Sequence, residues 1–265
     1  MVTGASSGIG REIAKSFDQP GNILSLVARR TTLLEGLRRE LRADSRVIEA
    51  DLARTNEPIE WLERAEKSAG PTDILVNNAG TSYVERTAGV DAERVRALFQ
   101  INVHTPIAAI HHVLPMMLSR GGGTIVNIAS NAAFSPAPFF AHYTASKGAL
   151  GNFSESLRME LERSGVHVLT VYPGPIHTPM ADRNWAQLDS HKPSKWVPIG
   201  DAAVLAGLVR RAVVRRHDRV IYPAVYKLGW WFPSVGRWVA ENLVPSAKET
   251  KTPPLDGDVP CGRVM

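Results

Sequence analysis

The chain has 265 residues, of which 44% are hydrophobic and 22% charged, so it can bury a large core and is unlike a disordered or low-complexity sequence. Its single cysteine, Cys261, excludes a disulfide framework and a thiolate metal cluster and favours a cytoplasmic location. The net charge of +5 is spread along the chain among acidic residues, which argues against a nucleic-acid partner, and no apolar run reaches the roughly 18 residues of a membrane-spanning helix.

Short apolar runs alternate with longer segments of helical periodicity. Strands are predicted at 23–27, 46–49, 74–76, 124–128, 166–171 and 219–222. Helices are predicted at 11–17, 32–42, 58–68, 92–119, 143–163 and 201–216. Because each return to a parallel strand needs a crossover, this alternation predicts a doubly wound α/β fold, with a parallel sheet and helices on both of its faces.

A glycine-rich segment, Thr3-Gly4-Ala5-Ser6-Ser7-Gly8-Ile9-Gly10, precedes the first predicted helix. Its glycines allow a tight turn and a close approach of the backbone to a diphosphate at the helix N-terminus, although an ordinary loop is the alternative. The cofactor contacts expected here are Gly4, Ser6, Ser7, Gly8, Ile9 and Gly10.

Further motifs follow in chain order. They are Asn77-Asn78-Ala79-Gly80, Ile101-Asn102-Val103, Ser130, Tyr143-Thr144-Ala145-Ser146-Lys147 and Pro173-Gly174-Pro175-Ile176-His177-Thr178. With the glycine-rich turn, they resemble the short-chain dehydrogenase/reductase family over residues 1–225. The resemblance implies a Rossmann-type fold and an NAD(P)-dependent oxidoreductase, such as a carbonyl reductase, that acts on a carbonyl or an alcohol. The alternative is a nucleotide-binding sensor or interaction module without turnover.

The resemblance implies that Asn102, Ser130, Tyr143 and Lys147 are the catalytic residues. Tyr143 and Lys147 share a helix face, and the Lys147 ammonium would lower the pKa of the Tyr143 phenol, which is then the general acid/base. Ser130 would bind the substrate oxygen. Asn102 either holds a water or bonds the backbone at a helix kink.

The cofactor is expected to be NADP(H), with NAD(H) as the alternative. Ala28 occupies the position where an acid would bind the ribose of NAD, and Arg29 can pair with a 2′-phosphate unless it is simply solvated. Asp51 and Leu52 would contact the adenine, with an N-cap as the other reading of Asp51. The remaining cofactor contacts implied by the family are Asn78, Ala79, Gly80, Tyr143, Lys147, Pro173, Gly174, Ile176 and Thr178, although Thr178 can also be read as a turn former.

The apolar segment 132–140 and the loop 180–197, which carries Trp185 and Trp196, are expected to line a cleft for a lipophilic or bulky carbonyl. The alternative is that these aromatic residues seal a core or subunit contact. No metal site is expected, because adjacent His111 and His112 diverge by about 100° on a helix.

One domain is expected over 1–225, with a substrate loop at 177–200, an aromatic-rich extension at 226–246 and a disordered tail at 247–265. The aromatic residues of the extension suit packing over the active site, a subunit contact or a peripheral contact with a membrane edge. The family resemblance also implies a homodimer or homotetramer formed through the predicted helices 92–119 and 143–163.

Only Met1 and Val2 precede the glycine-rich turn, so the first strand of the sheet is predicted to be truncated. A central strand is buried on both faces, and losing most of it costs several buried side chains of about 1.5–3 kcal/mol each. We therefore hypothesise a natural start upstream and a lower stability for this chain; a genuine two-residue stub is the alternative.

Overall fold

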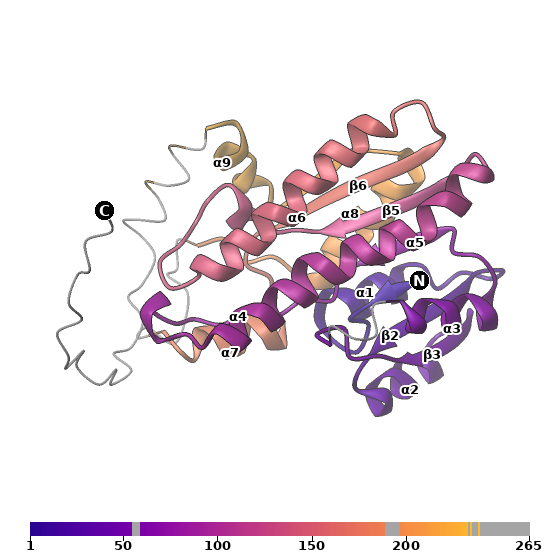
Figure 1. Ribbon diagram of the computed structural model, residues 1–265, viewed down its shortest axis with the longest axis horizontal. Coiled ribbons are helices and arrows are strands. Elements are labelled where there is room, and N and C mark those ends of the chain that lie inside the picture. The colour runs from indigo at the N-terminus through magenta and orange to yellow at the C-terminus, as the bar shows by residue number, and fades with distance from the viewer. Residues whose placement is uncertain (55–58, 189–196, 233, 235–237, 239–265) are drawn as a thin grey trace, which may run out of the picture.

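The computed structural model describes residues 1–54, 59–188, 197–232, 234 and 238. Its centre is a seven-stranded sheet in the order β3-β2-β1-β4-β5-β6-β7, in which all neighbouring strands are parallel (Figure 1). The strands are β1 (Val2–Thr3), β2 (Ile23–Ala28), β3 (Asp44–Glu49), β4 (Ile74–Asn77), β5 (Gly123–Ile128), β6 (Val166–Pro173) and β7 (Arg219–Tyr222).

Helices cover both faces of the sheet. The α-helices are α1 (Gly8–Ser16), α2 (Thr31–Glu40), α3 (Glu60–Ala69), α4 (Ala92–Phe99), α5 (Thr105–Ser119), α6 (Ala141–Glu160), α7 (Pro179–Trp185), α8 (Ala202–Arg215) and α9 (Lys227–Trp231). Short turns of other helix types are η1 (Thr87–Gly89), η2 (Gln100–His104), η3 (Asn131–Ala133) and η4 (Ala224–Tyr226). One hydrophobic cluster joins the sheet to α1, α2 and α8, and a second joins it to α3, α5 and α6. The predicted doubly wound α/β fold is confirmed.

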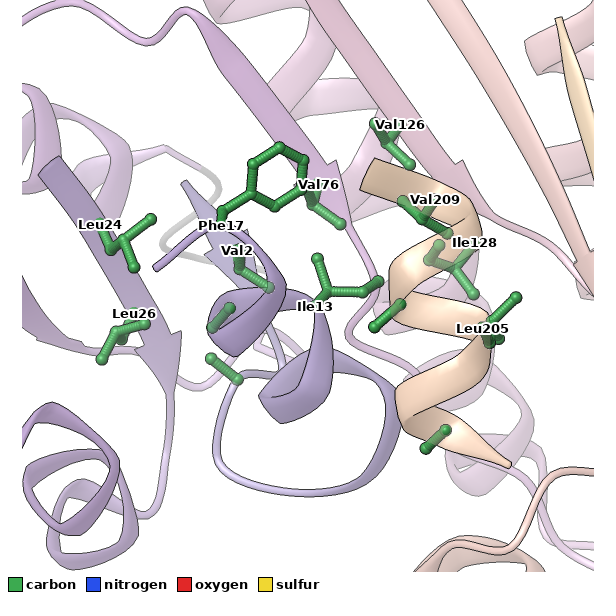
Figure 2. Packing of buried hydrophobic residues seen from close by; sticks show 14 of the residues in the cluster. Val2, Ile13, Phe17, Leu24, Leu26, Val76, Val126, Ile128, Leu205 and Val209 are labelled. Carbon is green, nitrogen blue, oxygen red and sulfur yellow. The ribbon is translucent and has the colours of Figure 1, made fainter. Parts of the chain in front are cut away.

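The strands carry apolar residues toward both faces, which explains their continuous hydrophobic runs. Leu26 belongs to the cluster with α1 and α8, whereas the next residue, Val27, belongs to the cluster on the opposite face. Figure 2 shows the first cluster, where Ile13 of α1 and Leu205 of α8 pack beside the strands. Each such buried side chain contributes about 1.5–3 kcal/mol.

The first strand is the predicted short stub, and it lies in the middle of the sheet. Val2 pairs with Leu26 of β2 on one side and with Val76 of β4 on the other. The second residue of the stub, Thr3, adds a link through its side chain. The Thr3 hydroxyl donates a hydrogen bond to the carbonyl oxygen of Val76 at 3.1 Å. It also accepts hydrogen bonds from the backbone N–H groups of Asn78 and Ala79, each at 3.0 Å. A side chain thus continues the link between β1 and β4. The hypothesis of an upstream start stays a prediction.

The predicted helix over 92–119 is continuous in the structure, but it contains a π-helical turn. The segment is divided into α4, the π-helical turn η2 and α5, and η2 places Asn102 in the interior. π-Turns of this kind are frequent at functional sites. Helix α7 also replaces part of the expected loop 180–197: the Thr178 hydroxyl accepts a hydrogen bond from the N–H of Ala181 at 3.2 Å and caps the helix.

The expected tail 247–265 and Trp196 lie outside the described residues. Among the residues that the structure describes, no helix is long and apolar enough to cross a membrane.

Replacing Thr3 with valine tests the side-chain link between β1 and β4. Valine keeps the shape of threonine but leaves the N–H of Ala79 unpartnered and the N–H of Asn78 with only the carbonyl oxygen of Val76 at 3.1 Å, so the free energy of unfolding should fall by about 1–3 kcal/mol. Thr3→Ser keeps the hydroxyl and is the matched control, with an expected loss of about 1 kcal/mol for the missing methyl group. Urea unfolding measures both, and a Thr3→Val protein as stable as Thr3→Ser would contradict the role of the hydroxyl.

Candidate active site

A cavity of about 750 Å³ lies at the carboxyl ends of the strands. In a doubly wound sheet this is where ligands bind: the strand order reverses between β1 and β4, so the chain leaves these two neighbouring strands in opposite directions and a crevice opens between them. The glycine-rich turn follows β1 and the segment 77–80 includes the end of β4, so both motifs border this crevice.

The turn after β1 forms a cradle for an anion. Gly4 and Gly8 have positive φ angles of 67° and 56°, which favour glycine. The first turn of α1 contains no acidic residue, and its N-cap, Ser7, makes no capping hydrogen bond from its side chain, so the helix N-terminus can bind a negative group. Of the predicted contacts in this turn, Gly4, Ser6, Ser7, Gly8 and Ile9 line the cavity. Gly10 instead packs against the neighbouring loop, since a Cβ there would lie 2.3 Å from Nδ2 of Asn78.

Two arginines follow β2 at the same end of the cavity. Arg30 donates hydrogen bonds to the hydroxyl groups of Ser6 and Ser7 at 2.9 and 2.7 Å, a contact that the sequence analysis did not predict. Arg29 lines the cavity with a side chain that is 66% exposed, and its Nη1 lies 3.7 Å from Oδ1 of Asp51. No aspartate or glutamate occurs among the described residues that line the cavity. This end of the cavity is therefore positively charged.

The structure separates the two residues that were expected at the adenine. Leu52 lines the cavity, but Asp51 does not. Asp51 pairs with Arg29 and Arg54 and accepts a hydrogen bond from the N–H of Ala53 at 3.2 Å. This carboxylate therefore contributes to the structure of the loop after β3.

Tyr143 and Lys147 lie on α6 and line the middle of the cavity. Nζ of Lys147 donates a hydrogen bond to the carbonyl oxygen of Ile128 at 2.8 Å, and burial lowers the pKa of this lysine to about 8. Burial also raises the pKa of Tyr143, while its hydrogen bond with Ser130 acts in the opposite direction. Loss of hydration is thus the larger effect on Tyr143 in this structure, and a lowering of its pKa by Lys147 together with the positive nicotinamide ring of an oxidised cofactor stays a prediction.

Ser130 lies two residues after the end of β5, directly before η3, and lines the cavity beside Tyr143. Its hydroxyl accepts a hydrogen bond from the N–H of Ala132 at 3.1 Å, which caps η3. The side chain is thereby oriented by the backbone around it.

Asn102 lies behind the cavity wall and is fully buried. Its side chain accepts a hydrogen bond from the N–H of Thr81 at 2.9 Å and donates to the carbonyl oxygen of Thr81 at 3.0 Å and to Oγ of Ser146 at 2.9 Å. It therefore joins the π-turn η2 to the loop after β4 and to the helix that carries Tyr143. These bonds agree with the expectation that Asn102 bonds the backbone at a helix kink. The other expected role, holding a water, stays a prediction.

Asn77 is structural in this arrangement. Its side chain donates a hydrogen bond to Oδ1 of Asn127 at 2.9 Å, and Nδ2 of Asn127 donates to Oγ of Ser154 at 3.0 Å. The next residues, Asn78, Ala79 and Gly80, line the cavity as predicted.

The turn after β6 completes the wall. The predicted contacts Pro173, Gly174, Ile176 and Thr178 all line the cavity. A Cβ on Gly8 would lie 3.1 Å from Cγ2 of Thr178, so the two turns are in close contact. Thr178 thus serves both as a helix cap and as part of the wall.

The far part of the cavity is mainly apolar. From the segment 132–140 it receives Ala132, Ser135, Ala137 and Phe140, and from α7 and the residues around it Met180, Ala181, Arg183, Asn184, Trp185, Leu188 and Val197. Tyr226, from the C-terminal extension, also lines it, in agreement with one of the roles expected for that aromatic segment, packing over the active site. Both segments expected to line a cleft therefore do so in the part of the chain that the structure describes.

This arrangement can bind a molecule with negative groups at α1 and transfer a proton at Tyr143. Among the described residues, no three His, Cys, Asp or Glu side chains gather as metal ligands would.

Comparisons with known proteins agree with this geometry. A family model described as short chain dehydrogenase matches residues 1–189. An uncharacterized oxidoreductase of Staphylococcus epidermidis is 34% identical over 182 residues, which cover 69% of this chain and 79% of that protein. Two solved structures are similar: a short-chain dehydrogenase from Sphingobium yanoikuyae in complex with NADPH (28% identity, TM-score 0.77, 94% and 97% of the two chains covered) and the bulky-bulky ketone specific alcohol dehydrogenase from Comamonas testosteroni (26%, 0.74, 92% and 93%). The chain therefore belongs to the short-chain dehydrogenase family and is an oxidoreductase.

Proposed function

We propose that the protein reduces a bulky, lipophilic carbonyl compound, or oxidises the corresponding secondary alcohol, with NADP(H) as the cofactor. The observation that carries this proposal is that one cavity contains three parts. They are a positively charged site for an anion at the glycine-rich turn, the group Ser130, Tyr143 and Lys147, and an apolar far end. The glycine-rich turn and the uncapped N-terminus of α1 fit a dinucleotide, which supplies or accepts the hydride when bound.

The residues of this chain handle the proton. Because burial raises the pKa of Tyr143, its phenol is protonated at neutral pH and can donate a proton to a carbonyl oxygen. Ser130, fixed by the N–H of Ala132, can donate a hydrogen bond to the same oxygen. The buried Lys147 ammonium favours negative charge at that position, and Asn102 is a positioning residue that acts through Ser146 and the loop after β4.

The preference for NADP(H) over NAD(H) rests on the end of β2. Ala28 cannot accept a hydrogen bond from the ribose, whereas Arg29 and Arg30 offer two cations to a 2′-phosphate. The similar Sphingobium yanoikuyae structure contains NADPH. NAD(H) remains the alternative.

The substrate class is supported by the apolar far end of the cavity, with Phe140, Trp185 and Leu188 among its lining residues. The name of the similar Comamonas testosteroni enzyme refers to bulky-bulky ketones. The competing function, a cofactor sensor without turnover, would be excluded by oxidation of NADPH in the presence of any ketone.

We further propose a cytoplasmic homodimer or homotetramer, with 1–225 as its domain. Exposed apolar side chains on α5 and α6, namely Met116, Leu118 and Met159, support contact between subunits through these helices. A peripheral membrane contact is the third proposal, supported by Trp231 and Phe232, which are 74% and 60% exposed.

Replacing Tyr143 with phenylalanine removes the proposed proton donor and little else. The expected result is a fall in kcat/KM of at least about 100-fold for any ketone that the wild type reduces, with an NADPH dissociation constant within about twofold of wild type. Tyr83→Phe is the matched control, since the buried hydroxyl of Tyr83 has no hydrogen-bond partner among the described residues and does not line the cavity. Full activity in Tyr143→Phe would exclude the assignment.

Replacing Arg29 or Arg30 with alanine tests the cofactor preference. Each change should weaken NADPH by about 10–100-fold, the equivalent of a charge-assisted hydrogen bond of about 1.5–3 kcal/mol, and affect NADH much less. Arg38→Ala, which removes a surface arginine paired with Glu35, is the control. Titration calorimetry gives the affinities, and equal losses for the two cofactors would show that neither arginine binds the 2′-phosphate.

Changing both Trp231 and Phe232 to aspartate tests the membrane contact. If these side chains enter a bilayer edge, the wild type should float with anionic vesicles and the double variant should not. Leu33→Asp, on the exposed surface of α2, is the control for a general effect of added charge. Failure of the wild type to float would end this proposal.

A further inference from the structure

Tyr226 is in direct contact with the backbone at the end of β6. A Cβ placed on Gly174 would lie 2.4 Å from Cε2 of Tyr226, so the tyrosine ring occupies the space that a side chain at position 174 would need. Real Cβ atoms do not approach carbon this closely, which means that glycine is required for this contact. Tyr226 also lines the cavity, so one part of its ring packs on the turn after β6 and another part faces the space for a ligand.

The hydroxyl of Tyr226 adds a polar contact to this packing of the ring. It donates a hydrogen bond to the carbonyl oxygen of Pro198 at 3.1 Å, at the return of the substrate loop. Burial raises the pKa of Tyr226 to about 12, so the phenol stays neutral and the bond persists across the physiological pH range. Tyr226 therefore connects the C-terminal extension, the turn after β6 and the end of the loop.

Tyr222, the last residue of β7, makes a similar connection. A Cβ on Gly200 would lie 2.4 Å from Cε1 of Tyr222, and the hydroxyl of Tyr222 accepts a hydrogen bond from the N–H of Asp201 at 3.3 Å. The return of the loop to the sheet is thus held by two tyrosines. Each ring therefore packs against the backbone of a glycine on one side and makes a hydrogen bond through its hydroxyl.

The extension that carries Tyr226 is anchored from its other end. The ring of Trp230 on α9 lies 5.0 Å from the ring of Tyr172 and 5.5 Å from that of Phe134, centroid to centroid. The guanidinium of Arg219 lies 5.4 Å from the centroid of Trp230. Such aromatic and cation–π contacts hold α9 against the core. Tyr226 is therefore a fixed wall of the cavity rather than a mobile side chain.

We propose that Tyr226 is a specificity-determining residue that limits the size of the group which the far end of the cavity accepts. Phe140 and Trp185 also line the far end, but Ala132 and Ala137 have short side chains that leave space there, and Met180 is unbranched and adaptable. A rigid aromatic ring among such neighbours decides which substituents fit. This inference rests on the proposed function, because it concerns the substrate end of the same cavity.

The test compares one ketone with a single bulky side, acetophenone, and one with two, benzophenone, in the full-length protein. Tyr226→Ala and Tyr226→Leu remove the ring, and Tyr226→Phe removes only the hydroxyl. Steady-state kinetics with NADPH give the ratio of kcat/KM for benzophenone to that for acetophenone. Titration of both ketones into the NADPH-loaded Tyr143→Phe protein, with and without the change at Tyr226, gives a second reading that needs no turnover. Trp231→Ala, an exposed residue of the same extension, is the control, and thermal unfolding identifies a variant that fails to fold.

Removal of the ring should raise the benzophenone-to-acetophenone ratio by at least about tenfold, in line with the discrimination that a few carbon atoms give in an apolar pocket. The Tyr226→Phe and Trp231→Ala proteins should stay within about threefold of wild type. If the wild type reduces ketones and the ratio does not move in folded Tyr226→Leu, the inference is overturned while the proposed function stands. If no ketone is reduced but the ring-deleted proteins bind benzophenone more tightly relative to acetophenone, the inference holds and the proposed reaction fails. Unchanged relative binding there overturns the inference as well.

Discussion

The link between β1 and β4 is the constraint on which the site depends. With two residues in its central strand, the sheet has few backbone hydrogen bonds at the place where the crevice opens. The Thr3 hydroxyl replaces part of that missing ladder by bonding three backbone groups of the neighbouring strand and loop. Because buried backbone groups must be partnered, this side chain fixes how far apart the glycine-rich turn and the loop after β4 lie. The distance between these two segments in turn sets the positions of the anion cradle and of the cavity wall beside Lys147.

The charge distribution of the cavity follows from this frame. Arg29, Arg30, Arg183 and Lys147 line it, and no acidic residue does so in the described part of the chain. Lys147 is nearly inaccessible, and the fall of its pKa to about 8 means that burial opposes its charge. The buried ammonium of Lys147 is therefore destabilising by itself, and a negative group of a ligand beside it would offset that cost. Loss of stability at a functional site is common, because catalysis and packing make different demands.

Much of this was predictable from the sequence because it depends on local patterns. Apolar runs gave the strands after β1, and the glycine-rich turn, Tyr143 and Lys147 were recognisable from spacing alone. A helix kink at Asn102 was one of two alternatives, but its π-helical form was not predictable, since a helix that gains one residue in a turn keeps nearly the same hydrophobic period. The contacts of Asn102 with Thr81 are tertiary and are seen only in the folded chain. Arg30 was adjacent to a predicted residue, but only its reach to Ser6 and Ser7 distinguishes it from a solvated arginine.

Three glycines of the cavity wall, Gly8, Gly80 and Gly174, each make room for a side chain from another segment. They show why the residues at the cofactor end were easier to predict from the sequence than those at the substrate end. Thr178 packs closely on Gly8, and Oδ1 of Asn102 lies 3.0 Å from where a Cβ of Gly80 would be. All four residues lie within the matched segment 1–189. Gly174 also lies in this segment, but the ring it admits, Tyr226, comes from beyond it. These contacts of the cofactor end thus lie within the matched segment, while at the substrate end Tyr226 joins Phe140, Trp185 and Leu188 from beyond that segment. A motif therefore predicts the chemistry, and the size of the substrate depends on a contact that only the folded chain reveals.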